Sequence, residues 1–291
     1  MAKYYEERHS IAAIWCQRFA VFLLPYFLLV ILLYRFGKIE TVQSWVLIAV
    51  GLLIGVFSLI FALRAIAELW SKGYRGGSKV VRGTILTLLV LAPFAYQAFL
   101  AVRFPLANDI STDTFSPPEY VNAAIFRASK VESGMNPVQE YDDDYSDLVV
   151  ASYPKLQSRR YPAGPERVLQ AVQAIIADNE WPITGTKGLP ENRTESEAEL
   201  DENTTTAGQD EELEDNVAAP DDIFIEILER TLIFGYENDV VIRIISEDQN
   251  TLVDVRSSSR WGRHDFGYNA RLIESILTQL DTALLGIAGE G

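Results

Sequence analysis

Three long apolar runs in the first third of the chain constrain its fold more than any other feature. They cover residues 11–34, 45–66 and 84–102, approximately. An α-helix needs about 20 predominantly apolar residues to cross the hydrocarbon core of a bilayer, and each run is near that length. A buried helix of a soluble protein would keep a polar face, which none of these runs has. The sequence therefore predicts a membrane domain over residues 1–104 with three transmembrane helices.

Basic residues flank the three runs unevenly, and this predicts the orientation of the chain. One side of the predicted spans carries eight of them and the other side three: Lys3, Arg8, Arg18, Arg64, Lys72, Arg75, Lys79 and Arg82 against Arg35, Lys38 and Arg103. Short cytoplasmic segments of membrane proteins are enriched in lysine and arginine. We therefore expect a bacterial inner-membrane protein with a cytoplasmic N-terminus and a periplasmic C-terminal domain. The lipid bilayer is its first expected partner.

Gly51 and Gly55 form a G-x-x-x-G pair inside the second apolar run. Small residues at this spacing let two helices approach closely in a bilayer. Packing inside the three-helix bundle is the default interpretation, and an oligomer formed through this seam is the alternative. No charged residue lies in the middle of a run, so the pattern gives no sign of an ion or proton pathway.

The net charge of -15 comes mostly from one segment. Residues 191–222 hold thirteen acidic residues and one arginine, and the rest of the chain is nearly balanced. Such a polar, acidic stretch cannot bury enough apolar area to order itself, so we predict a disordered acidic insert over residues 187–222. Without a basic surplus, a nucleic-acid partner is not expected. One cysteine and two histidines exclude an internal disulfide and a His/Cys zinc site, and no cofactor is expected.

After the apolar runs, residues 105–147 are rich in proline and predict an irregular connector. Residues 148–285 alternate strand and helix patterns in the order β-α-β, insert, β-β-β-α. Successive strands joined by short turns form an antiparallel meander, and helices cover one side of such a sheet. The sequence therefore predicts an α+β fold for this domain, outside the cytoplasm and following the three transmembrane helices.

Residues 251–280 contain the most informative local pattern. Residues 252–259 alternate as a strand does, so Arg256, Ser258 and Arg260 should share one face. A loop between two glycines follows with Arg263 and His264, and an amphipathic helix should begin near residue 269.

Basic side chains therefore converge near a helix N-terminus, where backbone N–H groups favour anions. This predicts a ligand-binding site for an anionic group, formed by Arg256, Ser258, Arg260, Arg263 and His264. The alternative is structural: Asp254 and Asp265 would pair with these arginines and fix the turn between strand and helix. Asn269, a good N-cap residue, should start the helix.

The sequence resembles that of the domain-of-unknown-function family 1499. Members often carry a G-[FY]-x-D-D-V stretch, a VRS-x-SR strand end and a G-x-x-D-x-G-x-N-x-x-R-I helix entry. Residues 235–240, 255–260 and 262–273 match these patterns, the last with Asp265, Gly267, Asn269 and Arg271. One departure is Asn238, where the family often has aspartate. The resemblance covers residues 115–280 and implies the domain limits and a structural motif, and bacterial members often have N-terminal membrane segments, but it implies no mechanism.

Three functional interpretations follow, and no catalytic residue is assigned in the first two. The first is a membrane-tethered module that binds an anionic ligand or an envelope component. The second is a non-catalytic scaffold or assembly subunit of the cell envelope, in which the same residues only stabilise the fold. The third is a hydrolase, because serines 257–259 lie near His264 and Asp265 in sequence. The sequence has no G-x-S-x-G motif, which makes the hydrolase the least favoured of the three.

Overall fold

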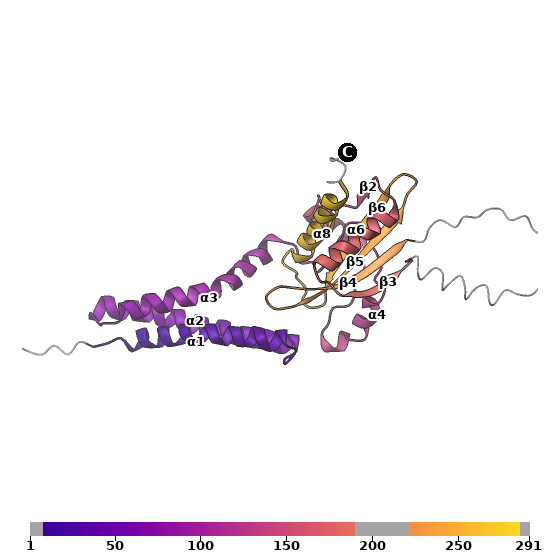
Figure 1. Cartoon of the computed structure of the whole chain (residues 1–291). Coiled ribbons are helices and arrows are strands. Elements are labelled where there is room, and N and C mark those ends of the chain that lie inside the picture. Colours follow the sequence, from indigo (N-terminus) through magenta and orange to yellow (C-terminus); the bar gives the residue numbers. More distant parts are fainter. Residues whose placement is uncertain (1–7, 190–221, 286–291) are drawn as a thin grey trace, which may run out of the picture. The chain divides into compact units, whose positions relative to one another are not determined.

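A computed structural model of the chain describes residues 8–189 and 222–285 (Figure 1). Contacts divide the chain into two compact units: the apolar helices up to Arg103, grouped with Leu232–Gly235, and a mixed domain formed by the remaining residues after Arg103. The predicted acidic insert falls almost wholly on residues 190–221, which lie outside the described residues.

The first unit consists of three long antiparallel helices, α1 (Ile11–Arg35), α2 (Thr41–Lys72) and α3 (Gly77–Arg103). Their mean hydropathies over the most apolar 18 residues are 2.1, 2.9 and 2.1, so each is long and apolar enough to cross a membrane. The predicted three-helix region is confirmed.

The glycine pair of α2 packs inside this bundle. A Cβ atom on Gly51 would lie 2.6 Å from the ring of Phe27 on α1, and one on Gly55 would lie 2.9 Å from Leu91 on α3. Further along α2, the hydroxyl of Ser58 lies 2.7 Å from the hydroxyl of Thr87 on α3. The small residues therefore let α2 contact both other helices closely, as the default interpretation expects.

The second unit is built on a six-stranded antiparallel sheet. Four strands form the predicted meander: β3 (Ile183–Lys187), β4 (Ile223–Arg230), β5 (Glu237–Ser246) and β6 (Thr251–Ser259). Two short strands, β1 (Asp109–Ser111) and β2 (Arg159–Tyr161), both pair with β6. The α+β fold is confirmed.

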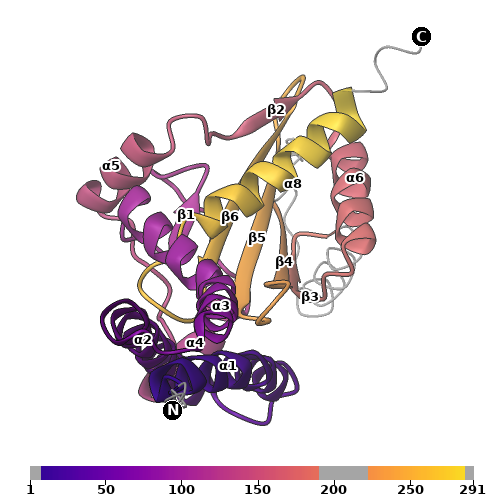
Figure 2. The same cartoon turned by 90° about the vertical axis from the view of Figure 1, so that its left-hand side faces the viewer.

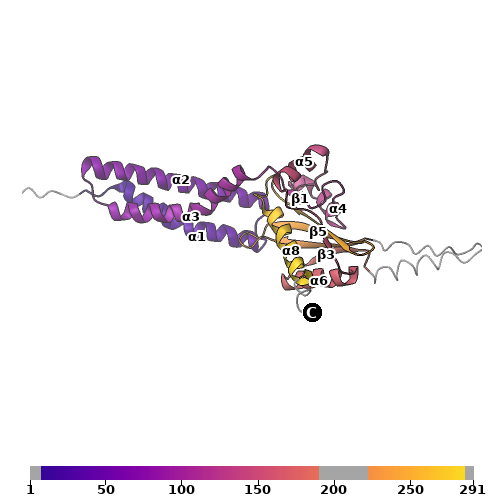
Figure 3. The same cartoon turned by 90° about the horizontal axis from the view of Figure 1, so that it is seen from above.

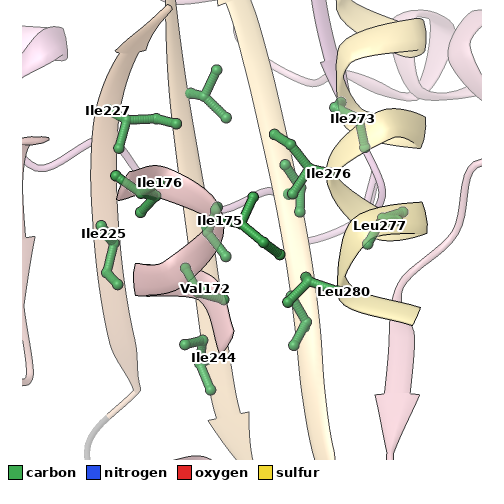
Figure 4. Close-up of a cluster of buried hydrophobic side chains, with 14 of the residues drawn as sticks. Val172, Ile175, Ile176, Ile225, Ile227, Ile244, Ile273, Ile276, Leu277 and Leu280 are labelled. Atoms are coloured by element: carbon green, nitrogen blue, oxygen red, sulfur yellow. The ribbon is translucent and has the colours of Figure 1, made fainter. Parts of the chain in front are cut away.

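Helices α6 (Pro165–Asp178) and α8 (Tyr268–Leu285) cover one face of this sheet (Figure 2). Their apolar sides meet alternate residues of the central strands in the main core, which Figure 4 shows. It includes Val172, Ile175, Ile176, Ile225, Ile227, Ile244, Ile273, Ile276, Leu277 and Leu280. The 3.6-residue period of the helices and the two-residue period of the strands each supply one layer.

The opposite face is covered by residues 105–147, which the sequence predicted to be irregular. This cover segment contains β1, α4 (Ala123–Ala128), the 3-10 turn η1 (Val131–Ser133) and the start of α5 (Asp143–Ser152). In Figure 3, α4 and α5 lie on the opposite side of the sheet from α6. The acidic run at residues 142–144 begins α5, where Asp142 accepts the amide N–H of Tyr145.

Candidate functional site

The sheet face beneath the cover segment carries charged side chains from β5 and β6. Arg256, Ser258 and Arg260 share this face, as their alternation predicted, and all three are buried. Buried carboxylates stand among them, on the same strands and on the cover segment. We call this set the arginine–carboxylate layer, with these members: Asp109, Arg127, Asp239, Arg243, Asp254, Arg256 and Arg260.

Arg256 binds the carboxylate of Asp109 through two hydrogen bonds, Nε to Oδ1 at 2.8 Å and Nη2 to Oδ2 at 3.1 Å. Its remaining N–H groups donate to the carbonyls of Pro118 and Gln139 on the cover segment. The rings of Tyr120 and Tyr141 lie 5.1 and 5.0 Å from the guanidinium carbon. Burial has the largest single effect and lowers the pKa of Arg256, but the charge and hydrogen bonds of Asp109 together with the neighbouring Tyr120 and Tyr141 outweigh it, and the net pKa is raised. The guanidinium therefore stays charged inside the protein, where it makes four hydrogen bonds.

Arg127 is one of the layer residues that sequence reasoning missed, with Asp109, Asp239 and Arg243. It is fully buried and comes from α4, where its Nε donates to Asp239 Oδ2 at 2.7 Å. Its two other nitrogens donate to the hydroxyl and the carbonyl of Ser258 at 2.8 and 2.6 Å. The only signal in the sequence was an arginine in a short helical pattern, because its partners lie more than a hundred residues away.

Arg260 shares Asp239 with Arg127. Its Nη2 donates to Asp239 Oδ1 at 2.7 Å, and its Nη1 donates to Glu237 Oε2 at 2.7 Å. The ring of Phe126 lies 4.7 Å from the guanidinium carbon. The carboxylate of Asp239 thus joins α4 to β5 and to the end of β6.

A third pair lies further along the same face. Arg243 Nη2 donates to Asp254 at 2.7 Å and to Asp113 at 3.0 Å. Beside it, Glu226 accepts from the backbone N–H groups of Asn122 and Ala123, which begin α4. The sheet therefore holds the cover segment by charge-assisted hydrogen bonds at several points, which are the stronger class of hydrogen bond.

The loop between β6 and α8 carries the other two predicted ligand residues, Arg263 and His264. Arg263 is exposed, and His264 stacks on Phe266 with ring centres 4.7 Å apart. His264 Nδ1 accepts the amide N–H of Phe266 at 2.9 Å. Phe266 has a φ of 56°, a left-handed conformation that is uncommon for any residue but glycine. The structure thus brings Arg256, Ser258 and Arg260 together in the layer and places Arg263 and His264 in this loop.

Asp265 caps α8, and the prediction that Asn269 is the cap was wrong. The Asp265 carboxylate accepts the N–H groups of Gly267 at 2.8 Å and Asn269 at 2.9 Å. Burial raises the pKa of Asp265, although these bonds favour its charged form. Because the cap aspartate already occupies the helix N-terminus, that end of α8 holds its own anion.

Asn269 instead ties α8 to the sheet from within the helix. It accepts from the hydroxyl of Ser257 at 2.7 Å and donates to the hydroxyl of Ser259 at 3.0 Å. Gly267 has a φ of 70°, and a Cβ atom there would lie 2.9 Å from the ring of Phe104. Arg271 donates to the carbonyl of Phe266. The four motif residues therefore join the loop, the helix and the sheet.

The serines of the hydrolase hypothesis are buried, and each hydroxyl has a structural partner. Ser257 donates to Asn269, Ser258 accepts from Arg127, and Ser259 donates to Asn238. Asn238 also donates to Glu229 at 2.7 Å. An aspartate at position 238 would place a second carboxylate against Glu229, which explains why an amide fits here.

Within residues 8–189 and 222–285, no three His, Cys, Asp or Glu side chains are arranged to hold a metal ion. A family model described as a protein of unknown function (DUF1499) matches residues 109–280, more than half of the chain. No curated protein and no solved structure matches the chain.

Proposed function

The chain belongs to the DUF1499 family, and from this premise we propose that it is a membrane-tethered binding module of the cell envelope. Its contact with an anionic group of a ligand or envelope component is made by Arg263 and His264. The tether consists of α1 to α3, and the excess of basic residues at one end of these helices supports a cytoplasmic N-terminus. The DUF1499 domain then lies in the periplasm of a bacterial inner-membrane protein.

The observation that carries this proposal is the rigid support of the loop that presents Arg263. Gly262 accepts, through its carbonyl, the side-chain amides of Asn108 and Asn136, and Asp265 donates its N–H to Ala107. Phe266, with its left-handed backbone, follows directly after these anchored residues. Backbone strain persists only where the surroundings over-determine it, and it is concentrated at functional sites.

Arg256, Ser258 and Arg260 act in this proposal as supports of the loop. Arg260 donates its N–H to the carbonyl of Glu237, and its own carbonyl accepts the N–H of Asn136. Both backbone polar groups of Arg260, which directly precedes the loop, are therefore hydrogen-bonded. A preorganised loop loses little conformational freedom on binding, which increases affinity.

The test measures thermal unfolding of the full chain in detergent micelles with phosphate, pyrophosphate or glycerol 3-phosphate. A ligand that binds only the native state stabilises it by about 2.7 kcal/mol at one hundred times its Kd. We expect a saturable rise in Tm with at least one of these anions, lost in Arg263→Glu. The matched control is Arg167→Glu, an exposed arginine on α6 that should leave the rise intact.

A scaffold without a small ligand is the second candidate, and the pairing within the arginine–carboxylate layer favours it. Arg256 and Arg260 already bind carboxylates of the same chain. If no anion raises Tm, or if Arg263→Glu and Arg167→Glu respond alike, the scaffold takes precedence. Site-specific crosslinking from position 263 in native membranes would then identify the envelope protein that it contacts.

A further inference from the structure

One end of the helical unit contains a cavity of about 570 Å³. Three basic side chains line it, Arg8, Arg64 and Lys72, together with His9 and the aromatic rings of Trp15, Phe61 and Tyr74. These residues come from the segment before α1, from the first turns of α1, and from the last turns of α2 and the residues just after it. The cavity belongs entirely to the first unit and is separate from the loop that carries Arg263.

Hydrogen bonds fix the segment before α1 in place, so this wall of the cavity is ordered. Ser10 donates its N–H to the carbonyl of Arg75, and Arg75 donates its N–H to the carbonyl of Arg8, both at 3.0 Å. The Ser10 hydroxyl donates to Glu68 at 2.8 Å and also caps α1 by accepting the N–H of Ala13. These bonds hold Arg8 and His9 beside the end of α2.

The charges around the cavity favour an anion. Arg8, Arg64 and Lys72 supply basic side chains, and Glu68 is the carboxylate among the lining residues. Glu68 already accepts from Ser10 and, at 3.3 Å, from Arg64. The positive charge that remains is suited to a phosphate group, whose oxygens accept several N–H donors at once.

The apolar side of the cavity indicates where in the membrane the anion sits. Trp15 and Phe61 lie where the apolar stretches of α1 and α2 end beside these cations, and Ile11 and Trp15 are 70% and 41% exposed. Tryptophan is enriched at the boundary between headgroups and hydrocarbon, with lysine and arginine just outside it. A cavity with a cationic rim and an apolar, aromatic floor at this depth matches both parts of a lipid.

We propose that this cavity binds an anionic phospholipid, with the headgroup phosphate at Arg8, Arg64 and Lys72 and an acyl chain along Trp15. Basic pockets between transmembrane helices are known to hold acidic lipid headgroups. The inference rests on the membrane insertion of the proposed function but not on its anionic ligand at Arg263. It assigns the helices a role in lipid selection besides anchoring.

The experiment uses the full chain in nanodiscs of phosphatidylcholine with increasing phosphatidylglycerol, followed by native mass spectrometry of the lipids retained. We expect the wild type to retain phosphatidylglycerol in preference to phosphatidylcholine. Arg64→Gln with Lys72→Gln should weaken that preference at least tenfold. The control, Lys79→Gln with Arg82→Gln, removes the same charge from the same end of the helices, at residues that do not line the cavity, and should keep the preference.

Two further measurements separate the sources of the phosphate and the possible failures. In the first, soluble glycerol 3-phosphate is added to compete with the retained lipid. Trp15→Ala should weaken lipid retention but leave the binding of glycerol 3-phosphate unchanged. If Trp15→Ala retains as much lipid as the wild type and glycerol 3-phosphate competes equally in both, the site binds free phosphate and the lipid proposal is overturned. Equal losses in both double variants would also overturn it, because bulk charge would then explain the binding. A chain that fails to enter nanodiscs would contradict the tether, whereas one that enters without lipid preference contradicts only this site.

Discussion

The two faces of the sheet in the DUF1499 domain are built from the same strands but by opposite means. Along β5, Val240, Ile242 and Ile244 join the apolar core beneath α6 and α8. Asp239 and Arg243 alternate with them and face the cover segment, where they bind Arg127 and Asp113. One face is held by apolar area removed from water, and the other mainly by specific pairs, beside a small apolar cluster of Tyr120, Ala123 and Val241.

This difference determines how each face should respond to change. The apolar face loses free energy roughly in proportion to the atoms removed, because burial is non-directional. On the polar face, removing one partner leaves a charge buried without compensation, which is far more costly than the pair is worth. The cover segment therefore depends on a few atoms, whereas α6 and α8 depend on many.

The largest expected effect comes from removing the carboxylate that two arginines share. Asp239→Ala should reduce the free energy of unfolding by about 3–5 kcal/mol, because Arg127 and Arg260 stay buried with a partner lost. Ile242→Val, on the same strand but the other face, should cost only about 0.5–1.5 kcal/mol. Urea unfolding of residues 104–291 as a soluble domain measures both, since the main core lies within that range.

The contrast between the faces would be broken if the two substitutions cost the same. A small cost for Asp239→Ala would mean that water reaches the layer and solvates both guanidiniums. Normal unfolding slopes with urea in both variants would establish that the native states remain compact.

The apolar face was predictable from sequence, and the polar face was not, for a physical reason. The core residues repeat with periods that single segments display, so β6, α8 and the meander could be read locally. The layer depends on pairs far apart in the chain: Arg256 binds Asp109 across 147 positions. β1 has three residues, too few to show any period, and its surroundings are rich in proline. The arginines of β6 were found, but their partners were hidden.

A double-mutant cycle at Asp109 and Arg256 sharpens the comparison at an intermediate scale. Each single substitution, Asp109→Leu or Arg256→Met, leaves one charge buried without its partner and should be strongly destabilising. The double variant should cost less than the sum by about 0.5–3 kcal/mol, because neither charge is left alone. Urea unfolding of the four proteins gives this coupling energy. Additive costs would show that Arg256 is held by the carbonyls of Pro118 and Gln139 instead.

The smallest effect concerns Glu229, a carboxylate at the end of the apolar face. Burial raises its pKa, although Tyr268 and Asn238 donate to it. A raised pKa in the folded state stabilises the protein below the unfolded pKa of about 4.3, and this contribution disappears as pH rises through the folded value. The unfolding free energy of the wild type relative to Glu229→Gln should therefore fall as pH rises from about 4 to neutrality. Urea unfolding at four pH values tests this, and a difference that stays constant with pH would contradict it.

The pairing of β3 with β4 has a consequence for the variation of this chain. Lys187 and Phe224 stand opposite each other in the ladder, so the acidic insert leaves and re-enters the sheet between neighbouring strands. Once two ends are held together, doubling a connecting loop costs only about 0.6 kcal/mol. The length of the insert should therefore change the free energy of unfolding little, and we expect it to vary among relatives. For the experimenter, the same position can accept an affinity tag or a fluorescent reporter without disturbing either face of the sheet.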